Sequence, residues 1–597
     1  MISEHSSICG SLNQYFALTL QDISIFVSQV MFRKKERVLS ELVYSFSSQS
    51  SGRPYSRTNF KKSDGGPLVE NNSCVVLCDC KVVFASEMER FTHVKHDCVE
   101  PYLPLLYFKH YFNASELSQK GSIDTHVTNE HQAKTPRDFF LHATNNSDIL
   151  VKDYTQSQIQ HDHHENHIYE AFYQSGFKEA AVLVNDRYDA KDKDVCISLA
   201  YIKEGQEPKI LKQFSKNVSI CYVYYEAAKQ IFNQSYAEGK LMGLSSYGKN
   251  NGQTYISWDD KLKTIVTDEN HGKEAILSFL KKCKTNKYDV MSARDLAFTI
   301  QKNFEDVMVE IVKYFKQLLE DEEIHTDNLC MSGGGILNCP TNSKIISLGL
   351  FKHYFASPHT SDACAESIGR VFRNMQIQGK QLKSQRLETS YLGVVYPRNE
   401  LIYKHKKIEK PNECLSNALK NGEVIAWYQG AAEYGPRALG HRSFLANPAT
   451  QDMLNALNII KGREAWRPLA PVVPEELFQR IFEVDNTDMC EFMLRTLKIK
   501  ERWRSRLKAV CHIDGTTRPQ LLKRKVNPRL YDLIMSFFEK THIPCLVNTS
   551  LNINGFPIVE TPRDFCHLIE EISLMKNIPK TRYVFVDSEE TFDVILD

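Results

Sequence analysis

Cationic side chains are concentrated in three short stretches of the last third of the sequence, each of which also contains glycine. The candidate residues are Arg437, Arg442, Lys461, Arg467 and Arg518. Planar guanidinium groups bind phosphates through paired hydrogen bonds and stabilise the charge that develops during phosphoryl or adenylyl transfer. A solvated surface charge explains one such arginine, but several in turn-like contexts favour a site for a triphosphate and an acyl phosphate. Aromatic residues do not interleave with these cations, which argues against a groove for nucleic acid.

Two polar side chains at the end of a predicted strand add hydrogen-bonding groups to this basic region. Residues 543–547 have the composition of a buried strand, and Asn548 and Ser550 come directly after them. Open α/β domains build ligand sites where strands end in polar loops. We therefore place the amide of Asn548 and the hydroxyl of Ser550 with the cations.

A different chemistry is indicated by His163 and His167, which are four residues apart. In a helix this spacing places both imidazoles on one face, where they can bind one metal ion. His161 is close by, so a fortuitous histidine-rich loop is the alternative. Asp362 is a candidate third ligand with a hard oxygen donor. Two histidines and a carboxylate with open positions suit an iron-type site.

A glycine-rich turn follows a predicted strand in the first half of the sequence. Gly333, Gly334 and Gly335 come after Ser332 and are followed by Asn338. Because glycine has no side chain, backbone N–H groups in such a turn can approach a phosphate closely. A tight turn without a ligand is the alternative.

The elements that must position these residues alternate between strands and helices. Residues 74–77 and 82–84 predict a hairpin, residues 180–184, 328–331, 424–427 and 543–547 predict strands, and residues 296–318 predict a long packed helix. Repeated transitions from a strand to a polar loop are typical of α/β domains. We therefore expect an α/β protein with its sites at strand ends.

Composition restricts the partners and the compartment. The chain has 597 residues, a hydrophobic share of 42% and a formal net charge of +1. A near-neutral total gives no indication of a nucleic-acid or membrane partner. The 16 cysteines have no regular spacing, which favours reduced thiols in a cytoplasmic protein. No apolar run approaches the ~20 residues that a membrane span needs.

Two composition changes suggest domain boundaries. Residues 1–66 are serine-rich and locally basic, which predicts a flexible N-terminal extension. Residues 397–411 are polar and lysine-rich, as linkers between domains often are. We therefore predict one domain over 67–400 and a second over 401–597.

Taken together and in order, these stretches resemble the O-carbamoyltransferase family of the nodulation-protein U type. The resemblance begins near residue 73 and continues to the C-terminus. The matching stretches are residues 89–92 with 95–97, 163–167, 238–248, 332–338, Asp362, 435–443, 461–471, 512–520 and 548–552.

The resemblance implies a fold and an activity. The first domain would be of the actin-like ATPase (ribonuclease-H-like) type, and the second a smaller twisted-sheet α/β domain of the threonylcarbamoyl-adenylate synthase type. The enzyme would form carbamoyl-adenylate from carbamoyl phosphate and ATP with Mg²⁺, and transfer the carbamoyl group to a hydroxyl of a small molecule. A homodimer is the expected assembly.

The resemblance also implies roles for the candidate residues. Fe²⁺ would be held by His163, His167 and Asp362. Carbamoyl phosphate and ATP would be bound by Arg437 or Arg442, Lys461, Arg467, Arg518 and Ser550. The adenylate would be held by Gly333, Gly334 and Gly335, and further nucleotide contacts would come from Asn338 and Asn548.

Some positions depart from the family pattern and keep other functions open. Glu70 and Asn71 stand where a His-Asp pair is usual, Cys364 replaces a glycine, and Phe556 replaces a glutamate. A tRNA threonylcarbamoyl transferase is one alternative, although binding tRNA requires a wide basic face. A non-catalytic sensor of nucleotide or carbamoyl phosphate is the other.

Overall fold

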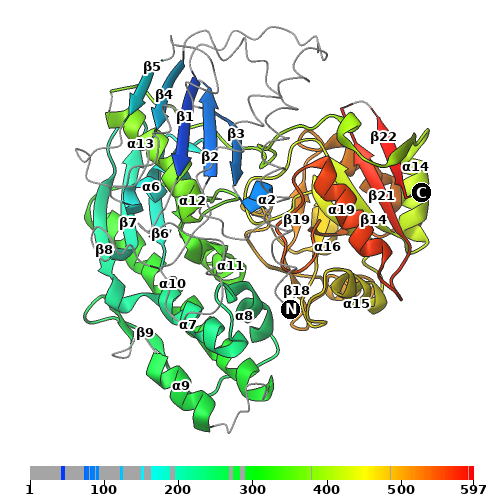
Figure 1. Cartoon of the computed structure of the whole chain (residues 1–597). Helices are drawn as coiled ribbons and strands as arrows, with labels where there is room; N and C mark the ends of the chain where they lie inside the picture. Colours follow the sequence, from blue (N-terminus) through cyan, green and yellow to red (C-terminus); the bar gives the residue numbers. More distant parts are fainter. Residues whose placement is uncertain are drawn as a thin grey trace, which may run out of the picture. The chain divides into compact units, whose positions relative to one another are not determined.

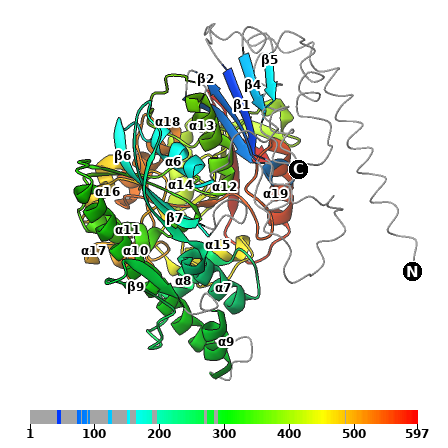
Figure 2. The same cartoon turned by 90° about the vertical axis from the view of Figure 1, so that its left-hand side faces the viewer.

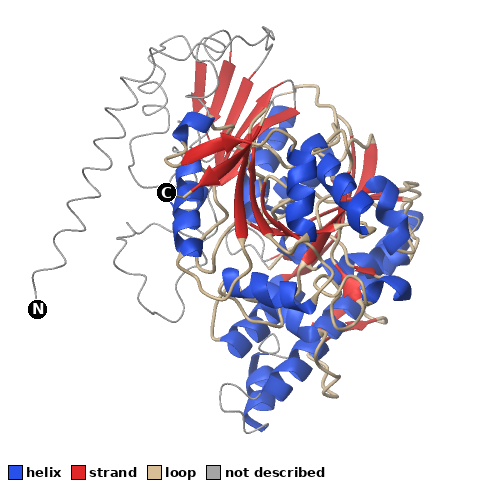
Figure 3. Cartoon of the chain, turned by 90° about the vertical axis from the view of Figure 1, so that its right-hand side faces the viewer, coloured by secondary structure: helices blue, strands red, loops and turns tan. Residues whose placement is uncertain are grey.

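The structure of the protein is a computed structural model. It describes residues 42–47, 73–78, 81–87, 89–92, 121–125, 150–153, 163–187, 195–267, 273–282, 290–377, 379–484, 486–588 and 590–596. Glu70 and Asn71 lie outside these residues. Strands and helices alternate along most of the described chain, so the protein is mixed α/β, as predicted (Figure 3).

The first five-stranded sheet has the strand order β3-β2-β1-β4-β5. Its strands are β1 (Leu42–Ser47), β2 (Ser73–Cys78), β3 (Lys81–Glu87), β4 (Gly121–Thr125) and β5 (Leu150–Asp153). β2 and β3 are the predicted antiparallel pair. β1 pairs with β2 on one side and with β4 on the other (Figure 2).

The prediction of a flexible extension over residues 1–66 is wrong at residues 42–47, which form β1. The sequence there alternates apolar and polar residues only briefly, and serine-rich segments follow it. A six-residue strand of this kind is stabilised by its two neighbours in the sheet, and local composition contains no information about those neighbours. The rest of that prediction lies outside the described residues.

The second five-stranded sheet has the order β12-β11-β6-β7-β8, and β6, β7 and β8 are labelled in Figure 1. Its strands are β6 (Glu179–Asn185), β7 (Val195–Lys203), β8 (Lys209–Ser215), β11 (Asn328–Ser332) and β12 (His353–Phe355). The strands predicted over 180–184 and 328–331 are confirmed as β6 and β11. These two strands are parallel, with Ser332 opposite Val184. The residues that follow them therefore meet at one edge of the sheet.

Helices surround this sheet and carry several candidate residues. Their bounds are α6 (His163–Tyr173), α7 (Ile220–Phe232), α8 (Glu238–Ser245), α9 (Lys273–Lys282), α10 (Val290–Asp321), α11 (Cys339–Ser347), α12 (Asp362–Cys364) and α13 (Arg370–Ile377). A short hairpin, β9 (Ile256–Asp259) with β10 (Thr264–Thr267), lies between α8 and α9 in the sequence. The long helix predicted over 296–318 is confirmed as α10.

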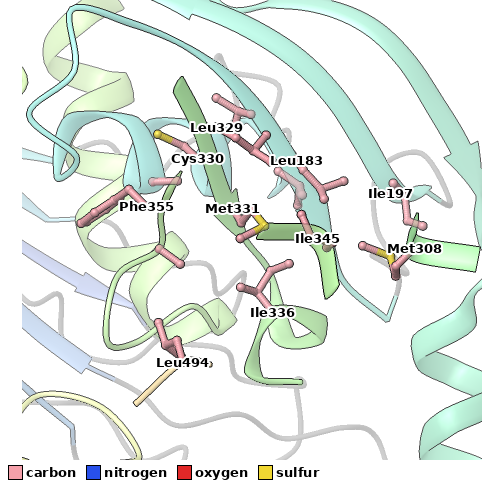
Figure 4. Close-up of a cluster of buried hydrophobic side chains, with 14 of the residues drawn as sticks. Leu183, Ile197, Met308, Leu329, Cys330, Met331, Ile336, Ile345, Phe355 and Leu494 are labelled. Atoms are coloured by element: carbon pink, nitrogen blue, oxygen red, sulfur yellow. The ribbon is translucent and has the colours of Figure 1, made fainter. Parts of the chain in front are cut away.

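A buried apolar cluster lies beneath the glycine-rich turn. Leu183 of β6, Met331 of β11, Ile345 of α11 and Ile336 of the turn belong to one hydrophobic core (Figure 4). Leu494 comes from the second half of the chain and joins the same core (Figure 4). The turn is therefore anchored by apolar contacts as well as by hydrogen bonds.

The eight-stranded sheet is built from residues after 400, in the order β13-β22-β21-β14-β15-β20-β16-β19. Its strands are β13 (Lys404–Lys407), β14 (Val424–Gln429), β15 (Arg442–Ala446), β16 (Ala470–Pro474), β19 (Gln520–Leu522), β20 (Leu546–Ser550), β21 (Thr581–Val586) and β22 (Thr591–Ile595). The strand predicted over 424–427 is confirmed as β14. The strand predicted over 543–547 begins later, so Asn548 and Ser550 lie within β20 and do not follow it.

The remaining elements complete this second half. The helices are α14 (Pro411–Lys420), α15 (Gln451–Ile460), α16 (Glu475–Ile481), α17 (Glu501–Arg504), α18 (Pro528–Thr541) and α19 (Pro562–Ser573), and the small strands β17 (Leu497–Lys498) and β18 (Thr516–Thr517) pair with each other. In the described part of the chain, no helix is both long and apolar enough to cross a membrane.

Candidate functional site

Two imidazoles and two carboxylates converge near the carboxyl end of β6. His163 and His167 lie on α6, Asp186 follows β6, and Asp362 begins α12. One ligand atom from each of the four lies within 4.8 Å of all the others. His163 Nε2 is 3.4 Å from an oxygen of Asp186, and both His163 Nε2 and His167 Nε2 are 3.5 Å from Asp362 Oδ1. The three residues predicted as metal ligands are thus brought together.

The electrostatics of this cluster fit a bound cation. Burial opposes ionisation of Asp362, but His163 and His167 outweigh it and hold its pKa well below the usual range. The pKa of Asp186 is also lowered, because the histidines overcome burial and the repulsion from Asp362. His167 Nε2 is buried without a hydrogen-bond partner among the described residues. Two ionised carboxylates and two imidazoles are a ligand set for a transition-metal dication.

Asp186 is a candidate metal ligand that the sequence analysis did not assign. Its position directly after a buried strand was a usable signal, since ligands collect at strand ends in α/β sheets. Besides facing His163, it accepts a hydrogen bond from the backbone N–H of Gly334 at 3.2 Å. One carboxylate therefore joins the metal-ligand cluster to the glycine-rich turn.

The glycine-rich turn makes protein contacts that explain two of its glycines. Gly333 has a φ of +95°, and a Cβ there would lie 2.4 Å from the carbonyl oxygen of Asn185. A Cβ on Gly335 would lie 2.4 Å from the Asn185 side chain. The N–H of Gly333 donates to the carbonyl of Thr360 at 2.9 Å. Close packing on β6 thus accounts for the sequence of the turn, and its nucleotide contact stays a prediction.

The side chain of Asn338 makes hydrogen bonds within the protein that have a structural role. This side chain accepts from the N–H of Thr341 as the N-cap of α11 and exchanges hydrogen bonds with Gln301 of α10. An N-cap residue of this kind stabilises a helix by ~1 kcal/mol. The contacts of Asn338 therefore hold α11 in place and leave a nucleotide contact as a prediction only.

A buried chain of hydrogen bonds leads outward from His167. His167 Nδ1 is 2.8 Å from Ser332 Oγ, and that hydroxyl donates to Glu170 Oε2 at 2.6 Å. Gln174 donates to the other oxygen of Glu170 at 2.9 Å. Burial raises the pKa of Glu170, and the hydrogen bond from Ser332 opposes that change. None of these outer residues except Ser332 stood out in the sequence.

Four arginines from the second half of the chain gather into one guanidinium cluster. They are Arg437, Arg463, Arg467 and Arg518. Burial and the repulsion from Arg518 lower the pKa of Arg437 to about 9, and burial with Arg467 and Arg518 does the same for Arg463. Burial also lowers the pKa of Arg467. Three predicted cations therefore lie together, and Arg463 joins them although the sequence analysis gave it no role.

Part of the guanidinium cluster has open hydrogen-bonding capacity. Arg437 Nε, Arg463 Nη2 and Arg518 Nε are buried and have no hydrogen-bond partner among the described residues. Glu464 is the nearest carboxylate that the structure pairs with the cluster, at 3.9 Å from Arg467. An anion between these side chains would satisfy the donors and relieve the repulsion.

Buried polar groups hold the loop that carries Arg437. Glu433 accepts hydrogen bonds from the backbone N–H groups of Leu439 at 2.7 Å and of His441 at 2.8 Å. Asn548 donates to the carbonyl of Ala438 at 3.1 Å and to the side chain of Gln520 at 2.7 Å. Asn548 therefore shapes the arginine loop in this structure.

Arg442 does not fit the predicted role of a phosphate ligand. Its side chain is fully buried and donates to the backbone carbonyls of Gln429, Gly430, His441 and Glu560. Its guanidinium carbon lies 3.6 Å from the ring centroid of Tyr428. Arg442 Nε has no hydrogen-bond partner among the described residues, but both Nη groups are occupied by backbone carbonyls, so Arg437 is the better candidate of the two arginines.

Lys461 and Ser550 meet, as the prediction of a shared site requires. The Lys461 ammonium donates to the Ser550 hydroxyl at 3.0 Å and to the side chain of Asn552 at 2.7 Å. The Ser550 hydroxyl in turn donates to Asn552 at 2.7 Å. In this structure the lysine charge stabilises the end of β20.

Helix α8 and the residues after it contact the stretches that carry these cations. Lys240 pairs with Glu464 at 2.9 Å, and the Tyr247 hydroxyl donates to the carbonyl of Trp466 at 3.2 Å. The thiol of Cys339, at the start of α11, is near enough to influence the pKa of Arg437. The guanidinium cluster is therefore bordered by the segment that follows the glycine-rich turn.

Two family models match the sequence. The model described as "Carbamoyltransferase N-terminus" matches residues 126–370, and the one described as "Carbamoyltransferase C-terminus" matches residues 416–578. The first match contains all four residues of the metal-ligand cluster, and the second contains the whole guanidinium cluster.

Full-length relatives agree with these models. The chain is 30% identical to nodulation protein NolO of Bradyrhizobium diazoefficiens, over 67% of this chain and 74% of that protein. It is 28% identical to nodulation protein NolNO of Sinorhizobium fredii, over 83% of this chain and 76% of that protein. It is 34% identical to 3'-hydroxymethylcephem-O-carbamoyltransferase of Streptomyces clavuligerus, over 40% of this chain and 46% of that protein.

Solved structures are more distant. HypF from T. kodakarensis is similar with a TM-score of 0.32 and 11% identity, over 58% of this chain and 49% of that chain. A similarity at this level carries no conclusion about the fold or the activity.

Proposed function

The chain belongs to the carbamoyltransferase family, and we propose that it activates a carbamoyl group with ATP and transfers it to a hydroxyl of a small molecule. The observation that carries the proposal is the guanidinium cluster, with its unpartnered buried N–H groups. A site that concentrates like charge in the ligand-free protein is suited to substrates that bring several negative charges.

Carbamoyl phosphate and ATP supply such charges. Water hydrolyses carbamoyl phosphate to phosphate and carbamate. An oxygen of the carbamate then attacks the α-phosphorus of ATP. The bond from that phosphorus to pyrophosphate breaks, so the products are carbamoyl-adenylate and pyrophosphate. Arg437, Arg467 and Arg518 would bind the phosphates and stabilise the charge that develops on them. ATP would enter as its Mg²⁺ complex.

The transfer step belongs to the metal-ligand cluster. The acceptor hydroxyl attacks the carbamoyl carbon, the bond from that carbon to the AMP oxygen breaks, and the hydroxyl proton leaves. When bound by His163, His167, Asp186 and Asp362, a divalent cation, iron by resemblance, supplies positive charge for the carbamoyl oxygen. Burial of His163, His167 and Asp186 limits the access of bulk water to the activated group, which would otherwise hydrolyse.

Two relatives support a hydroxyl as the acceptor. The proteins from Streptomyces clavuligerus and Amycolatopsis lactamdurans are named 3'-hydroxymethylcephem-O-carbamoyltransferases, and each is 34% identical to this chain over 40% of its length. The near-neutral charge of the chain disfavours tRNA as a partner, because tRNA binding requires a wide basic face. We therefore propose a small-molecule alcohol.

Partial reactions test this assignment. With carbamoyl phosphate and ATP, the unsubstituted chain should release pyrophosphate in a carbamoyl-phosphate-dependent reaction. Arg518→Ala should lose that release and keep its metal, because the guanidinium cluster performs the first step. The exposed Arg524 pairs with Asp532 at 2.9 Å, so Arg524→Ala is the matched control and should behave like the unsubstituted chain.

The outcomes separate the candidate functions. Pyrophosphate release that needs no carbamoyl phosphate, or no release at all, contradicts the proposal, and the second result favours a sensor. A strict requirement for tRNA and threonine would identify a threonylcarbamoyl transferase. If Arg518→Ala also loses the metal, the two steps have been assigned to the wrong groups.

A further inference from the structure

We propose that Glu170 is a positioning residue, which acts through the Ser332 hydroxyl to set the tautomer of the metal ligand His167. The inference rests on the metal centre of the proposed function and adds a residue to it. Glu170 does not touch the candidate ligand atoms. It lies three residues after His167 on α6, on the same face of the helix.

The contacts form a continuous buried chain from a carboxylate to an imidazole. Glu170 Oε2 accepts from Ser332 Oγ at 2.6 Å, and Ser332 Oγ is 2.8 Å from His167 Nδ1. The side chains of Glu170, Ser332 and His167 are completely buried. Water therefore does not compete for these hydrogen bonds, and each proton position is set by the neighbouring group.

The direction of the protons follows from what each group can donate. Both oxygens of Glu170 accept hydrogen bonds, one from Ser332 Oγ and one from Gln174 Nε2, so the single hydroxyl proton of Ser332 is directed to Glu170. The Ser332 oxygen can then only accept from the imidazole, which places the ring proton of His167 on Nδ1. His167 Nε2, which is 3.5 Å from Asp362 Oδ1, then has its lone pair available for a metal ion that both side chains would hold. This is the tautomer that binds a metal, and outer groups commonly fix it in metal sites.

Gln174 fixes the other side of Glu170. Its Nε2 donates both to Glu170 Oε1, at 2.9 Å, and to the backbone carbonyl of Glu170, at 3.1 Å. Turning the Gln174 amide around would place its oxygen against that carbonyl, so the donating orientation is retained. The atom of residue 170 that faces Gln174 must therefore be an acceptor.

This constraint makes Glu170→Gln a sharp test. The substitution conserves the shape of the side chain but reverses the direction of the hydrogen bonds in the relay from residue 170 through Ser332 to His167. The new amide must direct its oxygen to Gln174 and its NH₂ group to Ser332. The Ser332 hydroxyl then accepts from residue 170 and donates to His167 Nδ1. The imidazole proton moves to Nε2, where it hydrogen-bonds to Asp362 and blocks the metal position.

The experiment measures Co²⁺ binding by the full chain, using the visible spectrum of the bound ion. We expect the dissociation constant of Glu170→Gln to be about 10–100-fold larger than that of the unsubstituted chain. Ser332→Ala should lose affinity as well, and the double variant should lose little more, because both changes interrupt one relay. Glu165→Gln is the matched control: the same chemical change on the same helix, at a side chain paired with Arg373 at 2.7 Å.

A second measurement does not require a variant of Glu170. In the unsubstituted chain labelled with ¹⁵N-histidine and loaded with Zn²⁺, the signal of His167 should show the proton on Nδ1. The signal is identified by its loss in His167→Gln. A proton on Nε2 overturns the proposal, and so does an unchanged Co²⁺ dissociation constant in a folded Glu170→Gln. If the unsubstituted chain binds no Co²⁺, the metal centre itself is wrong, and the proposed role of Glu170 is wrong with it.

Discussion

Removing Arg437 should stabilise the ligand-free protein while abolishing carbamoyl-phosphate-dependent pyrophosphate release. In the ligand-free state Arg437 lies close to two like charges, those of Arg518 and Arg467. Arg437→Ala relieves that repulsion. The same substitution removes a donor that the substrates need, so stability and activity should change in opposite directions.

The magnitude follows from the electrostatics of the site. Burial and the neighbouring arginines lower the pKa of Arg437 to about 9. A tenfold change in an equilibrium corresponds to ~1.4 kcal/mol, so keeping this group charged costs at most ~5 kcal/mol. The side chain is only half-buried, and solvent screening together with the lost packing of its stem reduces the gain to ~1 kcal/mol. For a chain of this size we expect the melting temperature to rise by about 1–2 °C.

Calorimetry with and without inorganic pyrophosphate tests both parts. Pyrophosphate should raise the melting temperature of the unsubstituted chain by neutralising the guanidinium cluster, and Arg437→Ala should respond less. Arg524→Ala, at an exposed arginine outside the cluster, should resemble the unsubstituted chain in both conditions. The reasoning is refuted if Arg437→Ala melts at a lower temperature and keeps the full response to pyrophosphate.

Three further substitutions probe the other groups. Arg442→Met should lower the free energy of unfolding by ~3–5 kcal/mol, because backbone carbonyls lose their buried donors, and an unchanged melting curve would contradict this. His163→Ala should abolish Co²⁺ binding and acceptor carbamoylation but keep pyrophosphate release, and loss of that release would count against the division of steps. Burial raises the pKa of Glu560 from 4.5 to about 7, so the folded state holds a proton that the unfolded chain releases. Stability should therefore fall as pH rises through this range, and Glu560→Gln should gain ~1–3 kcal/mol at pH 8 but almost nothing at pH 4, by urea unfolding at each pH.

Local periodicity was sufficient to find the metal ligands that lie on one element. His163 and His167 are four residues apart on α6, and helical geometry alone brings them together. Asp186 joins them because α6 packs against β6, and it meets the glycine-rich turn because β6 and β11 are parallel neighbours. That pairing joins segments almost 150 residues apart in the sequence, and local patterns do not encode it.

For the guanidinium cluster, too, the sequence predicted some of the residues and the fold determined the others. Composition identified the arginines, but it did not separate Arg437 from Arg442, which are five residues apart in one glycine-containing stretch. The separation depends on strand register, because Arg442 begins β15 and lies beneath the chain that follows β14. Arg463 was recognised as a cation of its stretch but given no role, since its proximity to Arg518 is a property of the folded chain.

The interior place of β1 has a practical consequence for anyone who produces this protein in shortened form. A start site chosen after the serine-rich region would delete the strand that separates β2 from β4. Both neighbours would then expose rows of backbone donors and acceptors, which are templates for aggregation. Insoluble or inactive material from such a truncation would reflect a missing piece of the sheet, and its inactivity would say nothing about the catalytic groups.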